Sequence, residues 1–468
     1  MSLIKTVPAA PLFRQRVNAA PVFLDKEDYL LRVRLLKQRM EKKQVDFVVI
    51  YGDREHFSHM EYFTSYDCRF EEALMVMDRE GKVSMIVGNE GLSYSYQIPF
   101  KVDRYVYQNF SLQGQPRERP EALHQILSRT GICECSRVGL VGVKYFEDGR
   151  EGDPAHTFDL PAYILAAVYR LCPAEHVVNF TRELTGYPDG IRLRLHTPKE
   201  IAWAEYAGCR VANAVQNMLE ALAPGRSEWE VSARSGAGLE ANNVHPMINF
   251  GPRSVSLGLK SPRPDVYLEL GQACGVCYSV RGNLTSKIAV AARDLNSYSE
   301  ELRPYYENFY KAHFAAMVAW YEAARVGARC SDLYEAVYAH IDHERHGITL
   351  NPGHGTGTEE WINSAFSATS DHTLMDGEFI QVDIIASKSD PVRTSICEDA
   401  VVIALEKTRL QLAKEFPDVW KRIRARQRAM RETLGISISD DVLPMSNLNG
   451  VYYPFMLDLG VVFAKQEQ

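Results

Sequence analysis

The segment Asn351-Pro352-Gly353-His354-Gly355-Thr356-Gly357 says most about the fold, because two acidic residues follow it at defined distances. Asp383 lies 29 residues after His354, directly behind the apolar run Phe379-Ile380-Gln381-Val382. Glu398 lies a further 15 residues along the chain, just before a second apolar run. Apolar runs of this length are typical of buried strands, which direct neighbouring polar side chains into one pocket. We therefore predict a functional site that contains His354, Asp383 and Glu398.

This set of residues resembles the C-terminal half of the metal site in pita-bread enzymes, which include methionine aminopeptidases, Xaa-Pro aminopeptidases, prolidases and creatinases. The resemblance extends over most of the chain, from about residue 28 to about residue 405. It implies an α/β creatinase-like N-terminal domain followed by an α+β pita-bread domain. It also implies a hydrolase with a small-molecule substrate, assembled as a homodimer.

The first half of the chain reads as an arm and an α/β domain. Residues 1–27 are expected to form an irregular arm, and residues 28–190 the creatinase-like domain. Apolar residues recur at helical spacing from Glu27 to Lys43, and strand-like runs follow at 47–50, 73–77, 83–87 and 138–143. Helices that alternate with strands are typical of α/β domains. The turn-rich segment Thr185–Gly190 ends this part.

The second half is predicted to hold the catalytic-type domain, residues 191–405, and a C-terminal extension, residues 406–468. The domain opens with Thr197-Pro198-Lys199-Glu200, which combines an N-cap threonine, a proline at the first helical position and a glutamate three residues after the cap. A long helix through Leu222 should follow. In the extension, a helical pattern from Thr408 to Leu434 should break at Pro417.

Composition excludes several classes of protein. With 468 residues, 46% hydrophobic and 24% charged residues and a net charge of −7, the chain is expected to form a folded protein of at least two domains. It shows no basic stripe for nucleic acid and no apolar run long enough to span a membrane. Nine scattered cysteines and the absence of a signal-peptide pattern favour a reducing, cytoplasmic location.

The other half of the family's metal site looks neutral in this chain. In metal-dependent members, two Asp, one His and two Glu hold two divalent ions. Aligning Asn283 with the second Asp places Gln272, eleven residues earlier, at the first. Asp383 and Glu398 would then offer about two negative charges against about four positive ones, which is costly to bury. We therefore expect no metal, with one Mn, Co or Zn ion on His354, Asp383 and Glu398 as the alternative.

Creatinases show how the resemblance could hold without metal, since they grip a cationic guanidinium with carboxylates. Their catalytic histidine stands in a loop where this chain has Gly258, and a second family histidine is Trp361 here. His245 is a candidate replacement for the missing base, although a structural histidine would look the same. The neighbouring acidic pair Glu359-Glu360 is expected to be solvated loop charge rather than to face a substrate.

Two arginines complete the candidate residues for substrate binding. Arg253 and Arg393 are candidates because an arginine guanidinium can bind a substrate carboxylate through two parallel hydrogen bonds. An ordinary ion pair for either arginine is the alternative.

Three functions remain open. The leading hypothesis is a hydrolase of a C–N bond in a small amino-acid-like, guanidino or cyclic nitrogen compound, without a dinuclear metal centre. In it, His354 transfers a proton, Asp383 and Glu398 hold a cationic group, and Gln272 and Asn283 line the pocket. The second hypothesis is an Xaa-Pro aminopeptidase or prolidase with one metal ion. The third is a catalytically inactive homologue that binds a ligand in the inherited pocket.

Overall fold

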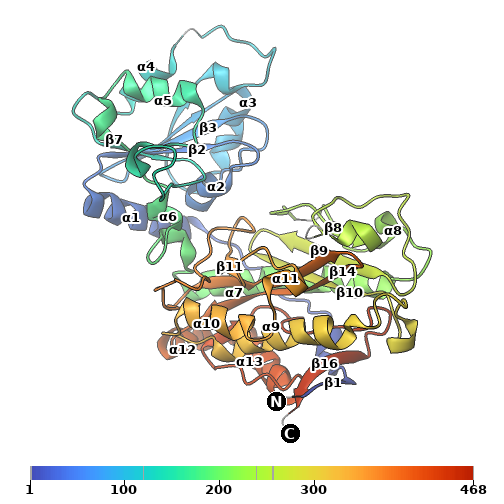
Figure 1. The fold of residues 1–468 in the computed structure, drawn as a ribbon. Helices are drawn as coiled ribbons and strands as arrows, with labels where there is room; N and C mark the ends of the chain where they lie inside the picture. The colour runs from blue at the N-terminus through green and yellow to red at the C-terminus, as the bar shows by residue number, and fades with distance from the viewer. Residues whose placement is uncertain (1–2, 120, 239, 256–257, 467–468) are drawn as a thin grey trace. The chain divides into compact units, whose positions relative to one another are not determined.

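The structure, a computed structural model, describes residues 3–119, 121–238, 240–255 and 258–466. These residues fall into two compact units (Figure 1). The first unit spans Phe23–Arg192, and the second joins the chain up to Val22 with the chain from Leu193 onward. The predicted arm up to Val22 and the C-terminal extension are therefore part of the second unit. The arm is not irregular throughout, contrary to expectation, because Leu3–Pro8 form a β-strand.

The first unit is built on a six-stranded mixed sheet in the order β5-β4-β3-β2-β6-β7. Neighbours β2/β3 and β3/β4 are antiparallel, whereas β4/β5, β2/β6 and β6/β7 are parallel. The four strands predicted from apolar runs are present. The strands are β2 (Phe47–Gly52), β3 (Ala73–Asp78), β4 (Val83–Val87), β5 (Asp103–Val106), β6 (Val138–Val141) and β7 (Val177–Asn179).

Helices cover both faces of this sheet, as alternating helices and strands predict. One apolar cluster packs residues of α1 and α2 on one face, and a second packs residues of α4 and α5 on the other. Helix α1 starts where the Asp25 side chain accepts a hydrogen bond from the backbone N–H of Glu27. The helices are α1 (Lys26–Lys43), α2 (Ser58–Thr64), α3 (Asn89–Tyr94), α4 (Leu123–Arg129), α5 (Ala162–Tyr169) and α6 (Arg182–Thr185).

The second unit is built on an antiparallel sheet in the order β11-β12-β14-β10-β9-β8, with β13 and β15 also paired to β14. The long strand β14 is the centre of this sheet and contacts four others. The strands are β8 (Met247–Phe250), β9 (Ala273–Val280), β10 (Asn283–Val290), β11 (His354–Gly355), β12 (Phe379–Val382), β13 (Ile385–Ser389), β14 (Val392–Ile403) and β15 (Val442–Pro444). Away from this sheet, β1 (Leu3–Pro8) pairs with β16 (Val461–Gln466).

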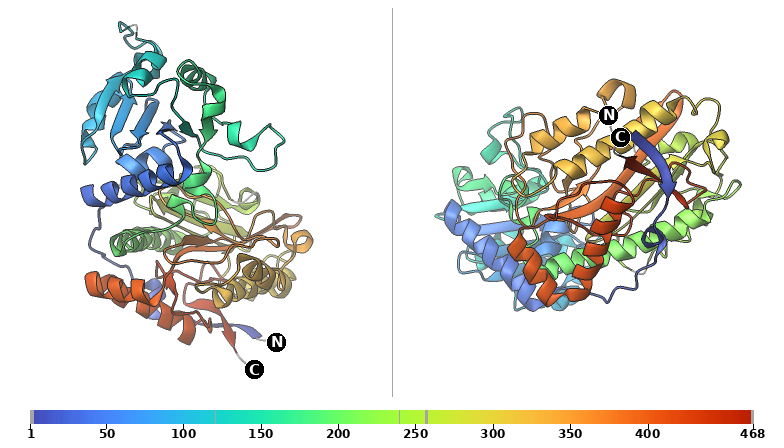
Figure 2. Two further views of the ribbon diagram at one scale, coloured as in Figure 1. Left: turned by 90° about the vertical axis from the view of Figure 1, so that its left-hand side faces the viewer. Right: turned by 90° about the horizontal axis from the view of Figure 1, so that it is seen from below.

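Long helices pack against this sheet (Figures 1 and 2). The Thr197 side chain accepts a hydrogen bond from the Glu200 backbone N–H at the start of α7, as predicted. The predicted break at Pro417 separates α12 from α13. The helices are α7 (Pro198–Ala221), α8 (Glu228–Ser232), α9 (Lys311–Ala323), α10 (Cys330–Tyr338), α11 (His343–His346), α12 (Glu406–Glu415) and α13 (Pro417–Glu432).

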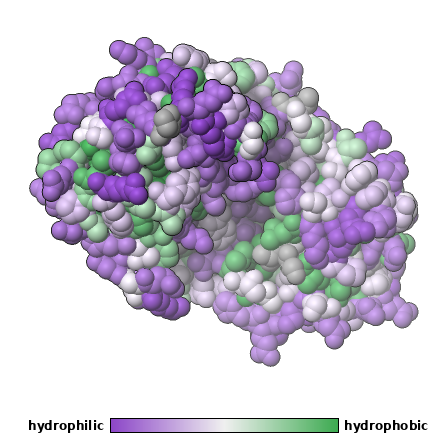
Figure 3. Space-filling model, turned by 90° about the horizontal axis from the view of Figure 1, so that it is seen from above, coloured by the Kyte–Doolittle hydropathy of each residue, from purple (hydrophilic) through white to green (hydrophobic). Residues whose placement is uncertain are grey.

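Surface hydropathy and helix hydrophobicity describe the outside of the molecule. Hydrophilic residues predominate on the face shown in Figure 3, with apolar residues interspersed among them. Within the described ranges, no helix is both long and apolar enough to cross a bilayer.

Candidate functional site

His354 is held rigidly in the second unit. Strand β11 pairs with β12 so that His354 lies opposite Gln381, and the His354 side chain is fully buried. Its Nδ1 lies 3.1 Å from the Gly355 carbonyl oxygen, which can only accept, so Nδ1 carries a proton. The ring stacks on Trp361 with 4.0 Å between centroids. The Gly355 hydrogen bond and the stacking on Trp361 therefore fix the orientation of the imidazole, and Nε2 is the nitrogen that faces the neighbouring carboxylates.

Two carboxylates approach that nitrogen from neighbouring strands. Asp383 follows directly after β12, and Glu398 lies within β14, its antiparallel neighbour. Asp383 Oδ2 and Glu398 Oε1 each lie 3.9 Å from His354 Nε2. The structure thus brings together the three residues that sequence spacing grouped.

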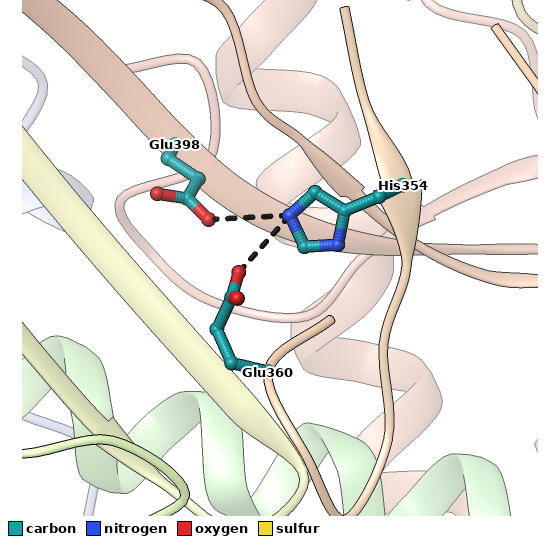
Figure 4. A group of neighbouring side chains, drawn as sticks. All are labelled: His354, Glu360 and Glu398. Atoms are coloured by element: carbon teal, nitrogen blue, oxygen red, sulfur yellow. Dashed lines mark ion pairs between the residues drawn. The ribbon is translucent and has the colours of Figure 1, made fainter. Parts of the chain in front are cut away.

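Glu360 is a third carboxylate at this point, and the sequence analysis assigned it wrongly. Its Oε1 lies 3.0 Å from His354 Nε2, and Figure 4 shows Glu360 and Glu398 approaching this nitrogen from different sides. The loop folds back because the backbone N–H of Ile362 donates to the Gly355 carbonyl, at 2.8 Å. This reversal carries Glu360 over the imidazole rather than into solvent. No local sequence pattern predicts that the loop after His354 folds back in this way.

Two uncharged residues complete the floor of the site. Ser286 of β10 lies opposite Cys277 of β9 on one side and Glu398 of β14 on the other. Directly paired residues in antiparallel strands share a face, and Cys277, Ser286, Glu398 and Asp383 all line one cavity. Cys277 and Ser286 are therefore the hairpin residues that face the carboxylates.

Gln272 and Asn283 do not take that place, contrary to expectation. Gln272 donates to the Tyr267 carbonyl oxygen at 3.5 Å, and Asn283 donates to the Ala204 carbonyl oxygen at 3.3 Å. Neither lines the cavity. The alignment assumed the family's eleven-residue spacing, but β9 and β10 are joined by a two-residue turn, which shortens the spacing between facing residues.

Arg253, Arg393 and His245 also lie outside the cavity lining. Arg253 Nε lies 3.1 Å from both oxygens of the buried Glu228 carboxylate. Arg393 donates to two backbone carbonyls at 3.0 Å and lies over the Tyr305 ring. The exposed His245 places Nε2 3.1 Å from the Leu259 carbonyl oxygen. These local contacts contradict their expected place in the substrate pocket.

The cavity is small and mostly apolar. It measures about 190 Å³. Besides its polar members, the walls consist of Val244, Met247, Leu259, Leu284, Ile288, Leu350, Trp361, Ile385 and Ile396. No lysine or arginine stands among the described lining residues, so the carboxylates face a wall without compensating charge.

The pKa values of Asp383, Glu398 and His354 are all shifted at this point. Burial raises the pKa of Asp383, His354 opposes the shift and Glu360 adds to it, and the net result is a pKa of about 7. Burial, then Asp383 and then Glu360, raises the pKa of Glu398 well above its usual value. Burial lowers the pKa of His354, but the nearby Glu360 and Asp383 outweigh it and the net change is a rise. The site therefore has a strong affinity for positive charge, as protons or as a cation.

This electrostatic arrangement predicts a pH-dependent stability in metal-free protein. A carboxyl whose folded pKa is raised, from 3.8 to about 7 for Asp383, holds its proton more tightly in the folded state. Its contribution is complete below about pH 4 and disappears as the pH rises through about 7. Urea unfolding in chelator should show this decline, and Asp383→Asn should flatten it. Equal slopes in both proteins would contradict the assignment.

The donor set fits one divalent cation. His354 Nε2 and one oxygen each of Glu360 and Glu398 lie within 4.8 Å of one another. His354 Nε2 and Asp383 Oδ1 are buried and make no hydrogen bond to the described residues. A nitrogen and carboxylate oxygens suit Mn, Co or Zn. A second cation would need anionic ligands where Cys277 and Ser286 stand, so the residues present do not fit two.

Comparison with solved structures places this architecture among peptidases. The chain is similar to the Xaa-Pro dipeptidase from Bacillus anthracis, with 14% identity, a TM-score of 0.59, and coverage of 81% of this chain and 96% of that one. It is also similar to the prolidase from Pyrococcus furiosus, with 16% identity, a TM-score of 0.59, and coverage of 79% of this chain and 96% of that one. A putative aminopeptidase P from Bacillus anthracis has 11% identity and a TM-score of 0.56, with coverage of 86% of this chain and 99% of that one. At these identities, the likeness concerns the fold.

The sequence itself matches a known family. Metallopeptidase family M24 matches residues 203–443, just over half of the chain, while no curated protein sequence matches significantly. Members of the family generally use divalent metals, which agrees with the partial set of ligands around His354. The match confirms the predicted pita-bread fold and the predicted class of hydrolases. The chain therefore belongs to metallopeptidase family M24.

Proposed function

We propose that the protein hydrolyses a C–N bond in a small, amino-acid-like or dipeptide-sized substrate, with one divalent cation in place of the family's dinuclear centre. The observation that carries this proposal is the convergence of His354, Glu360 and Glu398, two of which, the glutamates, also line a mostly apolar cavity. The printed names of the similar structures, a prolidase and an Xaa-Pro dipeptidase, support an Xaa-Pro amide as the first substrate to test.

Charge balance favours one cation over none. With the two carboxylates that the sequence pattern indicates, Asp383 and Glu398, a metal-free site is expected. Glu360 adds a third negative charge within 3.0 Å of His354. One divalent ion would compensate most of the charge of Glu360, Glu398 and Asp383, whereas an empty site leaves them to be neutralised by protons.

The chain's own residues account for the other requirements of hydrolysis. A bound divalent ion would supply Lewis acidity, which polarises the scissile carbonyl and lowers the pKa of water. Asp383, whose pKa is raised to about 7 by burial, can accept a proton at Oδ1 and return it to the leaving nitrogen. The aliphatic walls exclude bulk water and orient an apolar substrate group.

Cys277 is not expected to act as a nucleophile. Burial, followed by the negative charge of Glu398, raises the pKa of its thiol well above the usual value. A protonated thiol is a poor nucleophile. Cys277 therefore contributes a neutral wall where a charged ligand would be needed for a second ion.

Metal analysis tests the proposal directly. We expect mass spectrometry to find about one equivalent of Mn, Co or Zn per chain in protein grown with these metals. His354→Ala should lose it while remaining folded. Removal of the metal should stop cleavage of Xaa-Pro dipeptides. Wild-type protein that binds none of the three metals would overturn the one-cation site.

A metal-free hydrolase of cationic compounds is the second candidate. It is favoured by the absence of lysine and arginine among the described lining residues, because three carboxylates would then be free to hold a guanidinium. Turnover of a guanidino compound that persists in chelator would support it over the first proposal.

Assembly and location complete the proposed function. We propose a homodimer in the cytoplasm, without nucleic-acid or membrane partners, because the family resemblance and the composition favour both. Light scattering of the full chain that gave a monomer mass would contradict the dimer.

A further inference from the structure

The first unit holds a second pocket, which belongs to another part of the chain than the candidate active site. Its cavity measures about 350 Å³. The loop between α2 and β3 supplies Tyr66, Phe70 and Glu71, and helix α3 supplies Glu90 and Tyr94. The proposed function makes no use of these residues.

The buried acid in this pocket has one oxygen without a partner. Glu71 is only 4% exposed. Its Oε2 accepts a hydrogen bond of 2.8 Å from the Gly91 backbone N–H, in the first turn of α3. Its Oε1 is buried and makes no hydrogen bond to any described residue. Leaving a buried acceptor unsatisfied costs about 1–3 kcal/mol, and more for a charged group, so this oxygen calls for a donor from outside.

Aromatic rings line the same pocket as the Glu71 carboxylate. The Tyr66 and Tyr94 rings lie 5.1 Å apart between centroids at an interplanar angle of 59°. Phe70, which also lines the pocket, is 71% exposed although it is large and apolar. Tilted aromatic rings present their electron-rich faces to a group between them and attract cations there. The exposed Phe70 side chain gains the most if a ligand covers it.

The charges around the opening leave the pocket negative. Arg69, the only basic residue of the described lining, forms an ion pair with Asp67, so these two compensate each other. Glu71 and Glu90 remain as net negative charges. Among the described residues, the carboxylates of this pocket do not converge as the ligands of a metal ion would, whereas a hard ion such as Ca²⁺ takes six or more oxygen ligands. An organic cation fits both the charge and the aromatic surface.

We propose that this pocket of the N-terminal unit binds an organic cation of the primary ammonium or guanidinium type. The nitrogen would donate a hydrogen bond to Glu71 Oε1, and its alkyl stem would lie against Tyr66, Phe70 and Tyr94. Such a group is found both in free alkylamines and in lysine or arginine side chains. The proposal is independent of the proposed hydrolysis, because it concerns a different unit of the chain.

Calorimetric titration of the full chain tests the site with two probes, n-butylammonium for a free amine and N-acetyl-lysine amide for a side chain. We expect saturable binding of at least one probe and no binding of neutral 1-butanol. Glu71→Gln should weaken binding at least about 10-fold, because it removes the charge from a buried hydrogen bond. Tyr94→Leu, which retains apolar area but loses the ring face, should weaken it several-fold.

Two matched variants separate this pocket from the rest of the molecule. Glu55→Gln removes an equally negative but exposed residue of the same unit, and Glu360→Gln removes a carboxylate from the candidate active site. Both should bind the probe like wild type. Loss of binding in Glu360→Gln with retention in Glu71→Gln would assign the cation to the active site and overturn the proposal.

Other outcomes are equally decisive. Equal binding of 1-butanol would show that the pocket is merely apolar, and no binding of either probe would also overturn the proposal. If Glu71→Gln fails to fold, Tyr94→Leu decides, since Tyr94 is 40% exposed and can be replaced with little loss of packing. Preference for the lysine amide over the amine would identify a protein side chain as the source.

Discussion

Glu360→Gln should weaken the binding of a divalent cation by at least about 100-fold, which is the upper end of the effect of residues that only orient a ligand. Glu360 Oε1 is the carboxylate oxygen nearest to His354 Nε2, at 3.0 Å. The amide keeps the shape of the side chain but removes its negative charge. The side chain is 28% exposed, so the melting temperature should not change. Competition with a chelating dye would measure the affinity.

The adjacent glutamate is the matched control for this variant. Glu359→Gln removes the same charge one residue earlier, from a side chain that does not line the cavity. It should retain wild-type affinity. Equal losses in the two variants would mean that net charge of the loop, rather than a ligand, attracts the cation. An unchanged affinity in Glu360→Gln would remove Glu360 from the site.

Lys287→Met should destabilise the folded protein by about 3–5 kcal/mol, the cost typical of leaving one member of a buried ion pair alone. Lys287 Nζ lies 2.6 Å from Asp399 Oδ2, and the two side chains are 2% and 0% exposed. Nζ also donates to the Leu448 carbonyl at 2.9 Å. Burial raises the pKa of Asp399 to about 6 even with Lys287 present. Urea unfolding at pH 7 would measure the loss.

Two further variants show whether the loss comes from the unpaired acid. Lys287→Met combined with Asp399→Leu should recover part of the stability, because no buried charge then remains. Arg54→Met, which breaks an exposed pair with Glu55, should change the free energy of unfolding by less than about 0.5 kcal/mol. A loss below about 1 kcal/mol in Lys287→Met would contradict the importance of the pair.

This buried pair also supports the candidate site. Lys287 of β10 and Asp399 of β14 follow Ser286 and Glu398 in sequence, so they point to the opposite face of the sheet. Their attraction holds β10 beside β14 in the register that places Ser286 opposite Glu398. Loss of the pair should therefore weaken cation binding as well as stability.

Local sequence was sufficient for most elements of the fold. Four of the six strands of the first unit, the start of α7 at Thr197 and the break at Pro417 follow from apolar runs, caps and a missing backbone donor, whereas β5 and β7 were not predicted. The grouping of His354, Asp383 and Glu398 also needed only the sequence, since each residue lies in or beside a strand of one sheet. Such features depend on a few neighbouring residues.

The remaining members of the site depend on contacts that sequence spacing does not express. The pairing of β9 with β10, across a two-residue turn, brings Cys277 and Ser286 to the cavity in place of Gln272 and Asn283. A shift of one residue in such a pairing turns every side chain to the other face. Glu360 reaches His354 only because its loop folds back.

The same reason explains the three residues that were expected in the pocket and lie outside its lining. Arg253 is held by Glu228, which is distant in sequence, Arg393 by carbonyls of its own hairpin and His245 by a loop carbonyl. The sequence by itself determined the family fold and the histidine with its two strand carboxylates, because spacing and periodicity are local properties. Only the tertiary structure decided which other side chains share the cavity, because that depends on strand register and loop closure.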